Sequence, residues 1–206
     1  SIGTVTSRVD HIVENRQKFV ATSRYVGPDR RSPDRTDEAA DLGSFEVPNG
    51  VRYKTTGDLS AKVDLEKIER ANRIVQEHRL RRTTLQFGQI TAKLERFTKD
   101  KPGDKVPGKE LSEMTELMQY IARQTQDDAR QEVLDLVSSL EKIMNEAIFE
   151  GRPKSNLFAL LRVHGEALLA LLRGEEEAAD LVVRAVFTAA KVIDARASTR
   201  NNSELH

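Results

Sequence analysis

The sequence predicts an all-α protein: an antiparallel helical bundle of four to five helices with long helices, preceded by an N-terminal helix and an extended arm. Two observations lead to this fold class. Between residues 64 and 197, apolar residues recur at three- and four-residue spacing, the period of amphipathic helices. Charged residues make up 32% of the 206-residue chain and aromatic residues only 5%, a mixture that suits helices with broad solvated faces.

The N-terminal part is predicted to contain a helix followed by an irregular stretch. Residues 1–20 form the predicted N-terminal helix, which ends near Ala21, because Val9, Val13 and Val20 follow a roughly helical spacing. Residues 21–62 hold three of the six prolines and show no sustained period, so they are predicted to be a linker or a wrapping arm. Within this stretch, the sequence GVRYKTT suggests a lone strand-like segment.

The predicted helical bundle spans residues 63–198. Asp64 is a plausible N-cap for a helix over residues 65–97, with a bend near Gly88. Residues 111–148 are predicted as a second long helix or two collinear helices, with TQDDARQE as the polar middle.

Two more helices are predicted after Pro153. The first runs over residues 155–172, with Gly174 as its left-handed C-terminal residue. Residues 175–197 are apolar almost all round and are expected to be the most buried element. Residues 199–206 are expected to be a frayed tail.

Composition narrows the function classes. The chain has no cysteine, which excludes disulfides, thiolate catalysis and cysteine-ligated metals. Positive and negative residues balance at 33 each, so non-specific binding to nucleic acid is not expected. No apolar run reaches the length of a membrane span and no signal peptide opens the chain, which favours a cytoplasmic protein. No cofactor motif is present, and the four histidines lack metal-ligand spacing.

One segment resembles a known family. The sequence KFVATSRYVGPDRRS is similar to the C-terminal extension of bacterial response-regulator, receiver-like signalling proteins. The resemblance implies a role in two-component signal transduction and implies nothing about catalysis. A receiver needs an acidic cluster and a phosphorylatable aspartate at the ends of parallel strands, and no strand–helix alternation precedes residue 7. We therefore expect no phosphoacceptor pocket, and the remainder of the chain carries no comparable resemblance.

The arginine-rich stretch around Pro28 is the first candidate binding site. Its arginines present planar forks suited to carboxylates or phosphates. An alternative function is cyclic di-GMP binding, because Arg31 and Asp34 fit RxxD while Arg31 and Arg35 fit RxxxR, although the partner motif D/NxSxxG is missing. A structural interpretation stays open, in which Tyr25 and Val26 pack against the bundle. The candidate binding residues are Arg24, Tyr25, Asp29, Arg30, Arg31 and Arg35.

Two further patterns suggest phosphoryl chemistry. Asp127 and Gln131 stand four residues apart, as on one helical face, where a carboxylate and an amide could orient water toward a phosphorylated response regulator. They are the only catalytic candidates. His164 suggests phosphotransfer, but it shares a helical face with leucines and is predicted to be a histidine of the core or of its edge.

A basic patch is formed by Arg79, Arg81 and Arg82 on the first long helix. Interleaved glutamates and the lack of stacking aromatics make nucleic acid an improbable partner. The preferred interpretation of the whole chain is a non-enzymatic signalling and protein-interaction module that acts through a protein partner. Homodimerisation is an additional expectation, because the apolar stripes of the long helices exceed what one chain covers.

Overall fold

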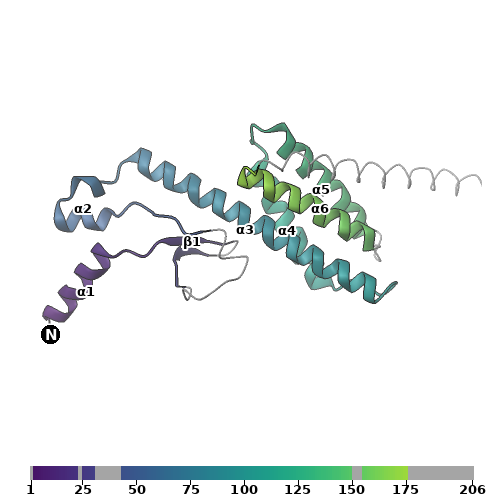
Figure 1. Cartoon of the computed structure of the whole chain (residues 1–206), viewed down its shortest axis with the longest axis horizontal. Coiled ribbons are helices and arrows are strands. Elements are labelled where there is room, and N and C mark those ends of the chain that lie inside the picture. Colours follow the sequence, from purple (N-terminus) through teal and green to yellow (C-terminus); the bar gives the residue numbers. More distant parts are fainter. Residues whose placement is uncertain (1, 23–24, 31–42, 150–154, 176–206) are drawn as a thin grey trace, which may run out of the picture. The chain divides into compact units, whose positions relative to one another are not determined.

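The computed structural model describes residues 2–22, 25–30, 43–149 and 155–175 (Figure 1). These residues form six α-helices, a short 3₁₀ helix and two short strands. The chain divides into two compact units, residues 1–82 and residues 83–206. The boundary falls inside one continuous helix, α3 (Leu65–Asp100), whose two halves therefore belong to different packing environments.

The first unit combines short elements of both kinds. Its elements are α1 (Ile2–Glu14), β1 (Phe19–Ala21), β2 (Val26–Pro28), α2 (Gly50–Thr56), the 3₁₀ helix η1 (Leu59–Ala61) and the first half of α3. The two strands pair antiparallel, with Val20 opposite Gly27. On the other edge of β1, Phe19 and Phe45 exchange both backbone hydrogen bonds, at 2.7 and 2.9 Å.

Two sequence-based assignments in this unit are wrong. The N-terminal helix ends at Glu14 rather than near Ala21, because the backbone of Phe19–Ala21 finds partners in β2 and Phe45. The segment GVRYKTT is helix α2 and not a strand. The Asn49 side chain accepts from the Arg52 amide at its start, and Gly57 ends it in the left-handed conformation with φ 71°.

Part of the predicted arm runs along the first half of α3. A Cβ on Gly43 would lie 3.9 Å from Cε1 of His78, and the rings of Phe45 and His78 are 4.8 Å apart. Further along, a Cβ on Gly50 would lie 3.2 Å from Cγ2 of Val63. The chain from residue 43 to residue 50 thus runs antiparallel to the first half of α3.

The start of α3 confirms the predicted cap. The carboxylate of Asp64 accepts a hydrogen bond from the Lys67 amide at 2.8 Å, and its carbonyl accepts from the Ile68 amide at 3.2 Å. The helix then continues without interruption through Gly88 to Asp100.

The second unit is a four-helix antiparallel bundle. The second half of α3 contacts α4 (Gly108–Thr125) and α6 (Ser155–Arg173) through side chains, and α5 (Gln131–Phe149) packs against both α4 and α6. Contacts between helices give their directions. Gln86 to Glu113 and Lys93 to Glu110 join α3 to α4. Arg130, directly before α5, contacts Leu171, and Ser139 of α5 contacts His164, so these contacts join α5 and its preceding turn to α6. Glu95 to Arg162 joins α3 to α6. In each pair of helices that two contacts join, the residue numbers run in opposite senses, and α4 and α5 are joined by a short turn. The predicted bundle is confirmed.

Residues 111–148 form two packed helices, and the prediction of a single or collinear helix is wrong. The turn at residues 126–130 separates α4 from α5 although it contains neither glycine nor proline. Arg130 stabilises it: its amide and guanidinium both donate to the Asp128 carboxylate at 2.8–2.9 Å, and its guanidinium also donates to the Leu171 carbonyl at 3.0 Å. The turn therefore depends on a contact with α6.

The C-terminus of α6 ends as expected. Gly174 has φ 71°, its amide donates to the Leu171 carbonyl, and the Glu175 amide donates to the Ala170 carbonyl, each at 3.1 Å. These two bonds form a Schellman motif. The predicted helix over residues 175–197 and the tail at 199–206 lie, apart from Glu175, outside the described residues.

An ionic cluster joins α3 to α6 at the edge of the bundle core. The Glu95 carboxylate is only 10% exposed and binds Lys99 at 2.6 Å and Arg162 at 3.0 Å. Arg162 also binds Glu166 at 2.6 Å. The hydrogen bond from Lys99, together with that from Arg162, lowers the pKa of Glu95 against the opposing effect of burial. The carboxylate therefore stays charged where it is nearly buried.

Glycine allows close approach of α3 and α6. A Cβ on Gly165 would lie 3.4 Å from Cδ1 of Phe87 and 3.9 Å from Cα of Gly88. A Cβ on Gly88 itself would meet nothing within 4 Å. A Cβ at Gly165 would therefore make ordinary van der Waals contact with α3, whereas a larger side chain there would meet the Phe87 ring.

We predict opposite effects for two glycine substitutions in the bundle. Gly165→Leu should lower the free energy of unfolding by about 1–3 kcal/mol, because the side chain would have to displace Phe87. Gly88→Ala should raise it by about 0.5–1 kcal/mol, because alanine favours the helix and its methyl group meets open space. Thermal denaturation followed by circular dichroism measures both, and effects of the same sign would contradict the packing described.

Candidate functional site

The segment KFVATSRYVGPDRRS, which resembles the C-terminal extension of response regulators, begins as a hydrogen-bonded hairpin. Thr22 and Tyr25 bracket its turn: the Thr22 amide donates to the Tyr25 carbonyl at 2.7 Å, and the Tyr25 amide donates to Oγ1 of Thr22 at 2.9 Å. The Tyr25 hydroxyl donates to the Pro28 carbonyl at 3.1 Å, which lays the ring over Gly27. A Cβ on Gly27 would stand 2.6 Å from Cζ of Tyr25. The Tyr25 ring thus occupies the space that a side chain at position 27 would need, so Tyr25 in this position requires glycine at 27.

Arg16 ties the hairpin to the arm. Its guanidinium donates to the Pro48 carbonyl at 2.8 Å and lies 5.0 Å from the centre of the Phe19 ring. Beside it, the Asp29 amide donates to the Lys18 carbonyl at 2.8 Å. The hairpin is therefore held to residues 45–48 by backbone, cation–π and guanidinium contacts.

The candidate binding residues are only partly described. Tyr25 is 43% exposed, Asp29 is half-buried and Arg30 is exposed. The expectation that Tyr25 and Val26 pack down is wrong, because Val26 is also 42% exposed. Arg24, Arg31, Asp34 and Arg35 lie outside the described residues, so the predicted arginine motifs stay predictions.

The arginines of the predicted basic patch are not freely accessible to a ligand. Arg79, Arg81 and Arg82 are half-buried, and each has a polar or ionic interaction of its own. Two arginines nearer the start of α3, Arg70 and Arg73, are exposed instead, and within the described residues neither has an ion pair. In the first half of α3, the accessible positive charge therefore includes these two arginines rather than the predicted patch.

The two catalytic candidates do not share a helical face. Asp127 lies in the turn between α4 and α5, whereas Gln131 is the first residue of α5. The Gln131 amide donates to the Asp135 carboxylate at 2.9 Å. The premise that one helix presents both side chains is wrong.

His164 is a core histidine, as predicted. It has no exposed surface; Nδ1 lies 2.9 Å from the Leu160 carbonyl and Nε2 lies 3.0 Å from Oγ of Ser139. Nδ1 therefore carries the proton, and Nε2 accepts from the serine. Burial lowers the pKa of His164, and the bond to the Leu160 carbonyl opposes that effect. The imidazole is enclosed by the bundle and is not placed for phosphotransfer.

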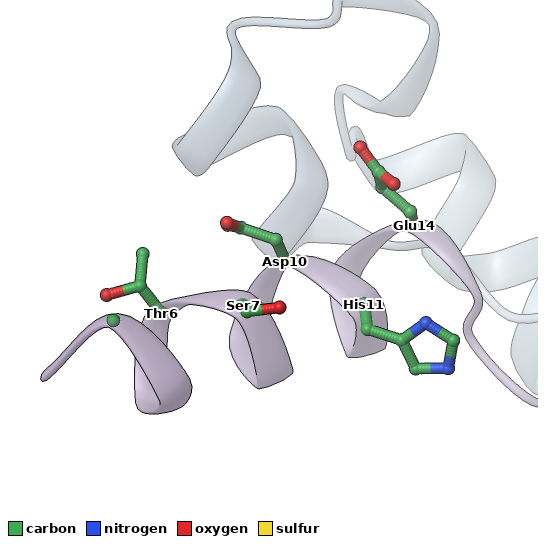
Figure 2. A pocket seen from close by; sticks show the side chains of 6 residues that line it. Thr6, Ser7, Asp10, His11 and Glu14 are labelled. Carbon is green, nitrogen blue, oxygen red and sulfur yellow. The ribbon is translucent and has the colours of Figure 1, made fainter. Parts of the chain in front are cut away.

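A hollow of about 640 Å³ lies along the polar face of α1 (Figure 2). All of its lining residues come from this single helix, so it has no opposing wall. Figure 2 shows the side chains of Asp10, His11 and Glu14 diverging from one another. Across the described residues, no group of three or more acidic or histidine side chains is placed to hold a metal ion.

A groove of about 390 Å³ with two walls lies between the arm and α3. One wall is the segment 46–48, and the other is formed by Ala71 and Ile74 with Lys67 and Arg70. The Lys67 ammonium donates to the carbonyls of Ser60 at 3.3 Å and Lys62 at 2.7 Å. The helix wall of the groove is thus apolar at Ala71 and Ile74 and basic at Lys67 and Arg70. The sequence does not indicate this groove, because the groove forms only where the arm lies along α3.

Apolar exposure is confined to the first unit. Within the described part of the chain, all eight large apolar side chains that remain exposed belong to this unit: Val5, Val9, Tyr25, Val26, Val51, Leu59, Leu65 and Ile68. Among its described residues, the same unit buries five apolar residues, Val13, Val20, Ala21, Phe45 and Leu80. Leu65 and Ile68 lie within residues 63–198, which the sequence predicts to form the helical bundle, yet both are exposed. The sequence does contain an indication that these two residues lie off the bundle core, because the apolar stripe of this helix changes direction before Phe87.

Comparisons with known proteins give no relative. No protein family, no curated protein and no solved structure matches the chain. None of the helices in the described part is long and apolar enough to cross a membrane.

We predict that Tyr25 and Gly27 are energetically coupled. Gly27→Ala should weaken the hairpin by about 1 kcal/mol, because the methyl group expels the Tyr25 ring. In a Tyr25→Ala background, the same change should have almost no effect. Hydrogen exchange of the Thr22 and Asp29 amides measures hairpin opening in all four proteins, and additive effects would contradict the predicted contact.

We predict that the bundle loses stability in mild acid through His164. The folded state disfavours the protonated imidazole, whereas the unfolded chain binds a proton below a pKa of about 6.5. The free energy of unfolding should therefore fall as the pH drops below this value, by at most about 1.4 kcal/mol per pH unit. The His164→Gln variant should show a flatter dependence between pH 7.5 and pH 5, whereas the exposed-site control His11→Gln should match the wild type.

Proposed function

We propose that the chain is a non-enzymatic protein-interaction module of a cytoplasmic bacterial signalling protein of the response-regulator type. One observation carries the interaction role: the first unit leaves eight large apolar side chains in solvent while the bundle leaves none among its described residues. Exposed apolar clusters on a folded protein mark surfaces that another molecule covers. The signalling context rests on the resemblance of KFVATSRYVGPDRRS alone.

The unequal burial of apolar side chains supports different roles for the two units, with binding assigned to the first unit. Leu59 and Leu65 are 74% and 70% exposed, so each leaves most of its transfer free energy unrealised in the isolated chain. The five apolar residues buried among the described residues of this unit give it little hydrophobic stabilisation. Covering part of this surface with a partner would stabilise the unit and at the same time provide binding energy.

The two alternative functions have weaker support. A phosphatase would need Asp127 and Gln131 to converge, and they lie on different local elements. Cyclic di-GMP binding would depend mainly on Arg31, Asp34 and Arg35, about which the described residues say nothing. The exposed apolar surface therefore favours a protein partner.

We predict that the partner contacts the first unit. A photo-crosslinking amino acid at Val9 or Val26 should yield a discrete adduct with another protein in the bacterium that encodes the chain, because both side chains are exposed and apolar. The same probe at Glu141, an exposed position on α5, is the matched control and should yield no such adduct. Mass spectrometry of the adducts identifies the protein.

Two results would overturn this proposal. Equal crosslinking from Glu141 and from the first unit would contradict the assignment of the binding surface to the first unit. Turnover of acetyl phosphate or of a phosphorylated response regulator, abolished by Gln131→Ala in a folded chain, would contradict the non-enzymatic role.

A further inference from the structure

The side chain of Asn49 forms hydrogen bonds at the ends of two helices at once. Its oxygen accepts from the Arg52 amide at 3.2 Å, at the start of α2, and its Nδ2 donates to the Val13 carbonyl at 2.9 Å, in the last turn of α1. Each end of a helix leaves backbone groups without an intrahelical partner, and both bonds satisfy such groups. The side chain at this position must therefore be a donor and an acceptor together, as a neutral amide is.

The residue after Asn49 is a glycine, and no other asparagine of the sequence precedes a glycine. Because glycine has no Cβ, its backbone nitrogen approaches the side chain of a preceding asparagine without hindrance. We propose that Asn49 and Gly50 form a self-modification site, at which deamidation of Asn49 detaches α1 from α2. This inference goes beyond the proposed function and does not depend on it, because the reaction needs no partner.

The reaction uses only the chain and water. The Gly50 nitrogen attacks Cγ of Asn49 and forms a new C–N bond, the bond from Cγ to Nδ2 breaks, and the proton of the Gly50 amide leaves with Nδ2 as part of ammonia. Water then opens the succinimide ring, at Cγ to give aspartate or at the backbone carbonyl of residue 49 to give isoaspartate. Gly50 is the first residue of α2, where a backbone amide has no intrahelical acceptor, so the attack breaks no hydrogen bond within the helix.

The docked position of α1 protects Asn49 from this reaction. Two hydrogen bonds hold the Asn49 side chain, and the Arg16 guanidinium links the same two segments by donating to the Pro48 carbonyl at 2.8 Å. Val13 is buried, but the other described side chains of α1 are exposed. A helix with so few buried contacts opens at a low free-energy cost, and opening frees the Asn49 side chain to turn toward Gly50.

Deamidation opposes the return of α1. The aspartate product still accepts from the Arg52 amide, and a carboxylate suits the N-terminus of α2. It has no hydrogen to donate to the Val13 carbonyl, and its negative charge stands against the negative end of the α1 dipole. The product therefore keeps the cap of α2 and loses the link to α1, and the loss of ammonia makes the change irreversible.

Peptide mapping by mass spectrometry, on the full chain incubated in its folded state at mildly alkaline pH, tests the site. Asn49 should convert to aspartate and isoaspartate faster than Asn15 and Asn72, which are exposed but precede arginines. Arg16→Ala removes the second link between the two segments. It should speed the conversion of Asn49 by about tenfold, the effect of one lost hydrogen bond from a charged donor.

A matched pair of variants tests the role of Gly50 as the nucleophile. A Cβ at position 50 would lie 3.2 Å from Cγ2 of Val63, so both proteins carry Val63→Ala to make room for it. Val63→Ala alone should convert Asn49 as the wild type does. Val63→Ala combined with Gly50→Ala should lose most of the conversion, because the added methyl group hinders the attacking nitrogen.

The Asn49→Asp variant tests the structural consequence, because it carries the aspartate product from the start. Relaxation of methyl resonances by a soluble paramagnetic probe measures the exposure of single valines in the full chain. The methyl groups of Val13 should lose their protection from the probe, whereas those of Val20, which is equally buried in the hairpin, should keep theirs.

Each part of the inference has an outcome that overturns it. Conversion of Asn49 no faster than that of Asn15 and Asn72 overturns the modification site, as does equal conversion in the two Val63 variants. A rate that Arg16→Ala leaves unchanged overturns the protection by docked α1, and a Val13 that stays protected in Asn49→Asp overturns its release. Crosslinking of another protein from Val26 does not depend on any of these results, so the proposed function fails or survives separately.

Discussion

The structure depends on a change of apolar face within α3. In the second half of the helix, the stripe that faces the bundle core consists of Thr84, Phe87, Thr91, Leu94 and Thr98, spaced alternately three and four residues apart. Extended backward by the same spacing, this stripe passes through Leu80 and then reaches Glu77 and Arg73, which are exposed. The bundle therefore cannot continue along the first half of the helix. That half must find other cover, which the arm from Gly43 to Gly50 supplies on one side only.

The bundle was predictable because its signals are local. A regular apolar period, the Asp64 cap and the Gly174 terminus are each determined by residues within a few positions of one another. The break between α4 and α5 escaped prediction because its turn is completed by the Leu171 carbonyl, 41 residues away from Arg130. The hairpin escaped for the same reason: Phe19 gains its second partner only when Phe45 arrives from beyond the arginine-rich stretch.

The candidate site was less predictable than the fold. The resembling segment drew attention to its arginines, yet its described residues serve the architecture: Thr22 closes the turn, Gly27 makes room for Tyr25, and Tyr25 holds Pro28. The groove and the exposed leucines come from residues that a helical period assigns to a core. A period shows that a helix has an apolar face but does not show which molecule covers that face.

Recognition is better placed in the first unit than in the bundle on energetic grounds. The bundle pairs several of its polar core groups internally, for example through the Ser139–His164–Leu160 chain and the paired Glu95 carboxylate, although Oγ1 of Thr83 is buried without a hydrogen-bond partner among the described residues. Such a core is closed, and opening it to a ligand would leave buried polar groups unsatisfied. In the first unit, by contrast, the strands and the arm are paired by hydrogen bonds within the unit while large apolar side chains stay in water. A partner of the proposed kind would therefore gain hydrophobic contact there without breaking any of these hydrogen bonds.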